Sequence, residues 1–282
     1  MENWEKKLVC GFLVNKFRGD SSLLAPAHKY IQDFTGKPVL GVIPFIKDIE
    51  IPEEDAARIP FDNTCGKDPE LIDVALVMLE KTSNFTDFAP LALEPDINLR
   101  IVRSRREFGN PAVVIIPGSK SVISDLTRLR ENGLAEKIIS AKRNGAWIVG
   151  ICGGLQICGE LIEDPHKIES KIKSAQGLGI IGLKTILDKE KTLIRVENAK
   201  TNLGTTTYGY EIHHGKTNHA KNVTVTIKRS DGTPIGFSES NVWTTYLHGV
   251  FDDDNFRRKF IDMIRKYLNM KVSGKIRAVY NI

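Results

Sequence analysis

The stretch from Trp147 to Gln156, Trp-Ile-Val-Gly-Ile-Cys-Gly-Gly-Leu-Gln, decides how the chain folds. Its first five residues form a continuous run that predicts a strand buried on both faces. Apolar residues as far as Ile162 recur at helical spacing, so a helix is predicted to begin directly after Cys152. The cysteine then occupies a sharp turn between a strand and a helix, which is the arrangement of a nucleophile elbow.

Strand–loop–helix units of the same kind lie before this elbow. Apolar runs predict strands over residues 71–78 and 112–116, and an alternating pattern predicts a strand over residues 97–102. Residues 117–120 lead into a helix, and a further helix is predicted over residues 134–143. Repetition of this unit predicts an α/β fold with a doubly wound, mostly parallel sheet.

The pattern changes after residue 175. A last helix is predicted after Asp252, with Phe256 and Phe260 among the apolar residues of one face. Before it, short alternating runs with little helix between them predict antiparallel strands added to the sheet. These runs span residues 178–187, 192–198, 207–213, 223–228, 234–238 and 242–247.

The first fifty residues form a unit of their own. A strand at 8–14, a helix at 22–34 and a strand at 39–43 predict a βαβ unit. So short a segment cannot bury both faces of a parallel strand pair, so we expect it to be the end of a larger α/β domain. We therefore divide the chain into four parts. Residues 1–55 are the incomplete domain, and residues 56–69 are a linker rich in proline and acidic residues. Residues 70–256 are the doubly wound domain, and residues 257–282 are a carboxyl-terminal helix with its tail.

Composition excludes several classes of protein. With 282 residues, 41% hydrophobic and 27% charged, the chain is expected to be globular and to form about two domains. The chain has no run of ~20 apolar residues, so we expect no membrane partner. Its start does not read as a signal peptide and its four cysteines show no CxxC spacing, so we expect a cytoplasmic protein. A net charge of +5 gives little reason to expect a nucleic-acid partner. One basic stretch is either an exposed strand end or a patch for an acidic substrate: Arg100, Arg103, Arg105 and Arg106.

Cys152 is the candidate nucleophile. The amino terminus of the helix that follows it stabilises a thiolate, and its glycine neighbours keep bulk away from the sulfur. The alternative is an inert buried cysteine beside glycines that are needed for packing. Cys158, on the inward face of the predicted helix, is expected to be a core thiol.

A thiolate nucleophile needs a general acid and base, which is normally histidine. His248 ends a strand and is followed by glycine, so it lies at the carboxyl edge of the sheet, where such sites form. His213 and His214 are its rivals, and because neighbours on a strand point to opposite faces, at most one of them is expected to face the site. His28 and His219 are expected to be surface residues.

Backbone N–H groups are expected to bind the oxyanion that forms on attack. Gly118 closes the strand beside the elbow, and its N–H can share the oxyanion with that of Gly153. The Gly-Ser-Lys-Ser stretch that begins at Gly118 lacks the spacing of a phosphate loop, so we reject nucleotide binding there. Spacings typical of metal ligands are also lacking, so no metal site is predicted.

Taken together, these motifs resemble the glutamine amidotransferase domain of the cobyric acid synthase family. The elbow motif around Cys152 and the Tyr-Leu-His-Gly-Val-Phe motif around His248 carry the resemblance, which covers nearly the whole chain. Further matching stretches are Asn15–Asp20, Gly41–Pro44, Ser83–Phe88, Pro117–Lys120 and Gly209–His213. The resemblance implies a flavodoxin-like class I amidotransferase fold.

The resemblance also implies an activity. Cys152 and His248 would hydrolyse glutamine, with Gly118, Gly153 and Gln156 binding the oxyanion and the substrate. The ammonia would amidate the b, d, e and g carboxylates of adenosylcobyrinic acid a,c-diamide, a corrinoid.

That amidation would use ATP and Mg²⁺ held by a synthetase domain of the dethiobiotin-synthetase type, so no cofactor is expected in this chain. Residues 1–55 would be the end of that domain, with Asn15 near the adenine. The remainder of the domain would be a missing amino-terminal portion or a separate subunit.

One departure from the amidotransferase pattern leaves a role open. Glutamate usually stands two residues after the catalytic histidine, where this chain has Val250. Glu211 and Asp252 are candidates to orient His248 instead.

Two other functions stay open: a glutaminase subunit for a related reaction, such as amidation of a cell-wall precursor, and a non-catalytic docking scaffold.

Overall fold

The computed structural model describes residues 2–45 and 70–278, and the chain divides into two compact units, residues 1–51 and 52–282. Each unit is described by itself. The predicted linker, residues 56–69, lies outside the described residues. None of the helices described is long and apolar enough to cross a membrane.

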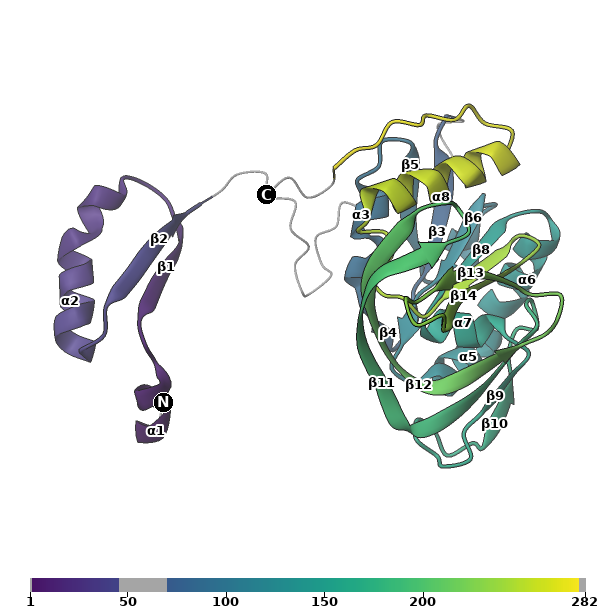
Figure 1. Ribbon diagram of the computed structural model, residues 1–282, viewed down its shortest axis with the longest axis horizontal. Coiled ribbons are helices and arrows are strands. Elements are labelled where there is room, and N and C mark those ends of the chain that lie inside the picture. The colour runs from purple at the N-terminus through teal and green to yellow at the C-terminus, as the bar shows by residue number, and fades with distance from the viewer. Residues whose placement is uncertain (1, 46–69, 279–282) are drawn as a thin grey trace. The chain divides into compact units, whose positions relative to one another are not determined.

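The first unit is the predicted βαβ unit, with its two strands parallel (Figure 1). A short helix at its start was not predicted, and the first strand begins later than expected and runs through Phe17. No residue of its main helix is buried, and Leu23 and Phe34 are 75% and 79% exposed. Its elements are α1 (Asn3–Leu8), β1 (Phe12–Phe17), η1 (Ser21–Leu24), α2 (Ala25–Thr35) and β2 (Val39–Pro44).

The second unit is built on five parallel strands in the order β5–β3–β6–β8–β15 (Figure 1). Placing the second strand outside the first is the flavodoxin-like order, which creates a site at the carboxyl ends of the strands. The predicted doubly wound fold is therefore confirmed. The five strands are β3 (Ile72–Val77), β5 (Ile97–Val102), β6 (Val113–Ile116), β8 (Trp147–Ile151) and β15 (Val242–Thr245).

Helices cover both sides of these strands, with α8 on one side and α5 and α7 on the other (Figure 1). Phe256 and Phe260 of α8 pack on Trp243, and Leu155 and Cys158 of α7 are fully buried. The helices are η2 (Phe85–Phe88), α3 (Ala89–Ala92), α4 (Arg105–Phe108), α5 (Val122–Glu131), α6 (Leu134–Arg143), α7 (Gly153–Cys158) and α8 (Asp254–Tyr267).

Further strands extend the sheet beyond β15, in the order β14–β13–β11–β9–β10, with β12 pairing with β11. A two-stranded antiparallel pair, β4 with β7, lies apart from this sheet. These strands are β4 (Thr82–Ser83), β7 (Gly118–Ser119), β9 (Leu161–Glu163), β10 (Ser174–Gln176), β11 (Leu183–Thr201), β12 (Thr206–His219), β13 (Thr224–Lys228) and β14 (Pro234–Glu239).

Three details of this region were predicted wrongly. The runs at 178–187 and 192–198 belong largely to one strand, β11, whose register with β12 shifts between Ile186 and Lys191. The run at 242–247 contains β15, which pairs in parallel with β8 rather than being an added antiparallel strand. Ile162 lies in β9 rather than in the elbow helix, because that helix ends at Cys158 before the extended Gly159.

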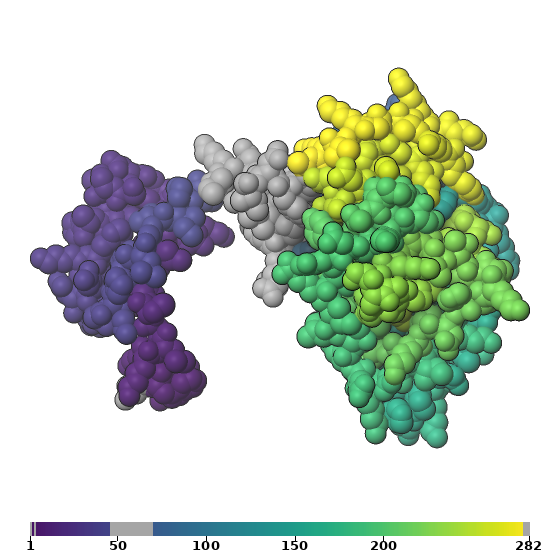
Figure 2. Space-filling model, in the orientation of Figure 1, coloured from purple at the N-terminus to yellow at the C-terminus, as the bar shows by residue number. Residues whose placement is uncertain are grey.

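The carboxyl-terminal helix is part of the second unit. Asp253 caps α8 by accepting a hydrogen bond from the Phe256 N–H, so the predicted boundary at 256/257 falls inside the helix. Arg257, fully buried, binds Glu94 at 2.7 Å and donates to the Arg277 carbonyl, which ties the tail to the unit. Figure 2 shows these last residues (yellow) covering one end of the unit.

The basic stretch predicted near β5 is not one patch. Arg100 is 2% exposed, and its guanidinium binds both carboxylate oxygens of Asp73, at 2.8 and 3.1 Å. Arg103, Arg105 and Arg106 are exposed. Arg100 differs from the other three because it is buried on β5, where Asp73 of the neighbouring strand β3 supplies the counter-charge.

Candidate active site

Cys152 lies on the predicted turn between β8 and α7. Its backbone has φ 50° and ψ −106°, a conformation that side chains rarely adopt and that marks a strained elbow. Glycines make this turn possible, because a Cβ on Gly150 would lie 2.8 Å from the backbone of Gly154, and one on Gly154 would collide with the Ile116 carbonyl. The elbow therefore has the expected geometry, with its cysteine 5% exposed.

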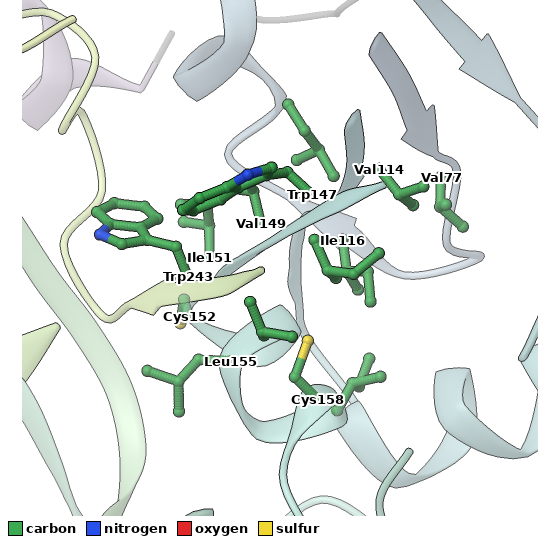
Figure 3. Close-up of a cluster of buried hydrophobic side chains, with 14 of the residues drawn as sticks. Val77, Val114, Ile116, Trp147, Val149, Ile151, Cys152, Leu155, Cys158 and Trp243 are labelled. Carbon is green, nitrogen blue, oxygen red and sulfur yellow. The ribbon is translucent and has the colours of Figure 1, made fainter. Parts of the chain in front are cut away.

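Cys158 lies on the inner side of α7. Figure 3 shows its sulfur directed toward Ile116 among the buried residues of the core. Complete burial raises the pKa of its thiol, which keeps it protonated. The structure thus places Cys158 in the core, as predicted.

His248 follows β15 and is completely buried. Its Nδ1 lies 2.7 Å from Oδ2 of Asp87, and the other oxygen of Asp87 accepts the Gly249 N–H at 2.9 Å. Asp87 comes from η2, at the carboxyl edge of the sheet. One carboxylate therefore fixes both the ring and the backbone beside it.

The two sequence candidates for this orienting role are wrong. Glu211 binds His213 at 3.1 Å and Arg229 at 3.0 Å instead of His248. Asp252 follows His248 in a turn in which its N–H donates to the Gly249 carbonyl. Asp87 precedes His248 by 161 positions, so local spacing could not reveal it. The only available signal was an acidic residue in the Ser83–Phe88 motif after β3.

The His248 ring is paired with Cys152 as well as with Asp87. Burial lowers the pKa of His248, but hydrogen bonds to Asp87 and Cys152 outweigh it and raise the pKa to about 10. The imidazolium is therefore the favoured form at neutral pH. Tyr210 stacks on the ring at 5.2 Å and exchanges two backbone hydrogen bonds with His248. Asn84 also contacts the ring, with Nδ2 3.2 Å from Nε2.

Gly118 and Gly153 both lie beside the elbow. Gly118 pairs with Ser83 between β7 and β4, and a Cβ on Gly118 would lie 3.2 Å from Cε1 of His248. A Cβ on Gly153 would lie 2.7 Å from the Ser119 nitrogen. The structure therefore brings together both glycines that were expected to form the oxyanion site.

A cavity of about 410 Å³ opens at the elbow. Gln156, predicted as a substrate residue, lines it and donates to the His214 carbonyl at 3.0 Å and to Tyr246 Oη at 3.2 Å. Most of the residues that line this cavity are charged or polar. The complete lining is Lys81, Ser83, Asn84, Ser119, Lys120, Ser121, Cys152, Gly153, Gln156, Ile168, Glu169, Lys191, Ile212, His213 and His214.

Part of this wall is held by Asp164, a fully buried residue that sequence reasoning missed. Its carboxylate accepts backbone N–H groups of Ile168, Glu169 and Ser170 at 2.7, 3.0 and 3.2 Å. Glu169 in turn accepts the Val122 N–H at 2.8 Å, which joins the loop to the start of α5. These bonds fix Ile168 and Glu169 on the cavity.

The remaining histidines differ partly from expectation. His213 and His214 both line the cavity, where the backbone carbonyl of His214 accepts a hydrogen bond from Gln156, so the expectation that at most one of them faces the site is wrong. His219 is exposed as predicted, whereas His28 is half-buried with its Nε2 enclosed.

Asn15 lies in the first unit and is exposed. Its side-chain oxygen accepts the N–H of Lys16, and its predicted contact with adenine stays a prediction.

The comparisons with known proteins agree with this geometry. A family model described as the CobB/CobQ-like glutamine amidotransferase domain matches residues 73–256, so the chain belongs to that family. It is 43% identical to the adenosylcobalamin biosynthesis bifunctional protein CobDQ of Leptospira interrogans, covering all of this chain and 33% of that protein. It is 37% identical to a cobyric acid synthase of Nitratidesulfovibrio vulgaris, covering all of this chain and 60% of the other.

Another cobyric acid synthase, from Limosilactobacillus reuteri, is 41% identical over 94% of this chain and 54% of its own. The chain thus spans between a third and three fifths of the length of these relatives. Among solved structures, a glutamine amidotransferase superposes with a TM-score of 0.53 at 15% identity, covering 70% of this chain and 99% of that one. PurLQS of Thermotoga maritima gives 0.53 at 16%, covering 70% and 98%, and both likenesses support the fold alone.

Proposed function

We propose that the second unit hydrolyses glutamine as the ammonia-producing part of a cobyric acid synthase. The observation that carries this proposal is the position of His248, whose Nδ1 lies 2.7 Å from Asp87 and whose pKa, against the effect of burial, is raised by Asp87 and Cys152. Such a series of nucleophile, proton carrier and orienting carboxylate is the arrangement that acyl transfer requires.

In the proposed reaction the Cys152 thiolate attacks the carboxamide carbon of glutamine. The electron pair of the C=O bond moves to oxygen, and the N–H groups of Gly118 and Gly153 stabilise the resulting oxyanion. Collapse of this intermediate breaks the C–N bond, and the His248 imidazolium gives its proton to the departing ammonia. Neutral His248 then takes a proton from water as the water oxygen attacks the thioester carbon. The C–S bond breaks, glutamate leaves, and the Cys152 thiolate and the His248 imidazolium are restored.

The cavity wall suits the amino-acid end of glutamine. Lys81, Lys120 and Lys191 offer positive charge to the α-carboxylate, and Glu169 offers a carboxylate to the α-ammonium group. Gln156, held by Tyr246 and the His214 carbonyl, would fix the position of the substrate side chain.

The ammonia would then amidate the b, d, e and g carboxylates of adenosylcobyrinic acid a,c-diamide in cobalamin biosynthesis. ATP and Mg²⁺ would be bound by a synthetase domain of which residues 1–55, including Asn15, form the end. The reaction would take place in the cytoplasm. The names of the relatives that match along the whole chain support this part of the proposal. The large exposed side chains of the first unit are those that such a domain would cover.

The thiol is tested with a glutamine-analogue electrophile such as diazo-oxo-norleucine. We expect mass spectrometry to find the label on Cys152, and Cys152→Ala to remove glutamine hydrolysis while Cys158→Ala keeps it. Labelling at Cys158 or Cys65 instead, or hydrolysis that survives Cys152→Ala, would refute the assignment.

The synthetase coupling is tested separately. Glutaminase activity of this chain alone is expected to be slow and to rise when the synthetase domain, ATP and the corrinoid are added. With those components, Cys152→Ala should still amidate the corrinoid from ammonium chloride but not from glutamine. Failure with ammonium chloride would contradict the corrinoid reaction without affecting the glutaminase assignment.

A further inference from the structure

A second cavity, of about 350 Å³, lies on the extended part of the sheet and shares no lining residue with the catalytic cavity. It is formed by the end of β11, by β13 and by the turn after β13. Lys200, Lys228 and Arg229 line it, and its described lining includes no acidic residue. The positive charge of this cavity has no role in glutamine hydrolysis.

Two of these cations face each other directly. Lys200 and Lys228 are partners in the antiparallel register of β11 and β13, and both are exposed. Like charges at directly opposed positions of an antiparallel pair are destabilising. Neither lysine has an ion pair within the part of the chain that the structure describes. Their repulsion would be relieved by an anion placed between them.

The third cation is already committed. Arg229 binds Glu211 at 3.0 Å and Asp231 at 2.8 Å, so its guanidinium forms a fixed wall rather than a free binding group. The two lysines are therefore the charges available to a ligand.

A buried hydroxyl provides an independent observation. Thr226 lines the same cavity and is the extra residue of a β-bulge, because Val225 pairs with Phe237 and Ile227 with Gly236. Bulges redirect side chains and are frequent next to binding sites. Thr226 is 2% exposed, and its hydroxyl has no hydrogen-bond partner among the described residues. A buried polar atom without a partner is rare and calls for an explanation.

We propose that this cavity binds the phosphate group of a small molecule. Lys200 and Lys228 would neutralise its charge, and the hydroxyl of Thr226 would donate to one of its oxygens. Lysine is a usual phosphate-binding residue, and hydrogen bonds to ionised oxygens are stronger than neutral ones. The cavity is larger than inorganic phosphate, so it can hold either free phosphate or the phosphate group of a small ester.

Isothermal titration of the full chain tests this proposal, with inorganic phosphate and glycerol 3-phosphate as probes at constant ionic strength in chloride. We expect both to bind, and tighter binding of the ester would identify the ligand as a phosphate ester rather than free phosphate. Lys200→Gln with Lys228→Gln should weaken binding at least tenfold. The matched control, Lys266→Gln with Lys271→Gln, removes the same charge from exposed positions elsewhere and should leave binding unchanged.

Thr226→Val separates the hydroxyl from the charges. Because the hydroxyl is unpartnered without ligand, this change should not lower the melting temperature, yet it should weaken phosphate binding several-fold. Equal binding by the wild type and the Lys200/Lys228 variant, or no binding by the wild type, would overturn the proposal. Neither result bears on glutamine hydrolysis, since no catalytic residue is changed.

Discussion

Two buried histidines next to the catalytic cavity each bind a carboxylate, but their surroundings differ. His248 binds Asp87 at 2.7 Å, and against the effect of burial Asp87 and Cys152 together raise its pKa. His213 binds Glu211 at 3.1 Å and stacks on Tyr246 at 3.8 Å, with its other ring nitrogen buried and unpartnered among the described residues. A carboxylate beside a histidine therefore does not identify the catalytic base; contact with the sulfur does.

The two carboxylates also differ in how their charge is used. Glu211 shares its charge with Arg229, which lies 3.0 Å away. Asp87 receives two hydrogen bonds, from the His248 ring and the Gly249 N–H, and its charge also raises the pKa of the neighbouring groups. Its negative charge thus acts chiefly on the imidazolium, whereas that of Glu211 is neutralised within the fold.

The largest expected effect separates the two histidines. His248→Ala should lower kcat for glutamine hydrolysis by about 10²–10⁴-fold, because it removes the proton carrier. His213→Ala should cost less than about tenfold, since the described contacts of this ring are with Glu211 and Tyr246. Ammonia release measured under saturating glutamine checks both variants. An inactive His213→Ala beside a fully active His248→Ala would reverse the assignment.

The second effect separates the two carboxylates. Asp87→Asn should lower kcat by roughly 10²-fold, at the low end of the range for acid–base groups. Because Asp87 raises the pKa of His248, its removal lowers that pKa, and the alkaline limb of the pH–rate profile should move to lower pH. Glu211→Gln should leave this limb in place. A limb that does not move in Asp87→Asn would show that Asp87 supports only the fold.

Sequence reasoning found the parts of this comparison that depend on local pattern. An unbroken apolar run predicted β8 and an alternating pattern predicted β5, both with correct bounds. The elbow was found because Cys152 lies between such a run and a helix, with glycine on its carboxyl side.

The rest depends on tertiary contacts. Asp87 meets His248 only because β3 and β15 end at the same edge of the sheet, and no spacing in the sequence reports that meeting. His213 and His214 both line the cavity although they are neighbours on β12, and an alternating pattern does not reveal this because it takes no account of backbone groups such as the His214 carbonyl, which binds Gln156.

A smaller effect concerns Asp252, the other carboxylate near His248. Burial, followed by the charge of Asp87, raises the pKa of Asp252 to about 6. Since the folded-state pKa lies above the unfolded value, the native state binds more protons between about pH 4 and pH 6, and stability falls as the pH rises through this window. Asp252→Asn removes that loss.

Thermal unfolding measures this difference. At pH 7.5 Asp252→Asn should be more stable than the wild type by about 1 kcal/mol, which is less than the full pKa shift would give because Asp252 is partly exposed to solvent. Below pH 4 the two proteins should unfold at the same temperature. Its kcat should stay within about threefold of the wild type, in contrast to Asp87→Asn. A kcat loss as large as that of Asp87→Asn would return Asp252 to the role of orienting His248.

The smallest effect joins the His213 side of the comparison to the proposed phosphate site. Arg229 lines the second cavity and binds Glu211, which binds His213 in the wall of the catalytic cavity. A phosphate held by Lys200 and Lys228 would place negative charge beside the Arg229 guanidinium, which stays bound to Glu211, and would weaken its attraction for the Glu211 charge that faces the His213 ring. With ¹⁵N-labelled histidine, saturating phosphate should therefore shift the imidazole signals of His213 and leave those of His248 unchanged. The Lys200→Gln/Lys228→Gln variant should show no such shift. Phosphate binding without any change at His213, or with an equal change at His248, would show that Arg229 and Glu211 do not connect the two cavities in this way.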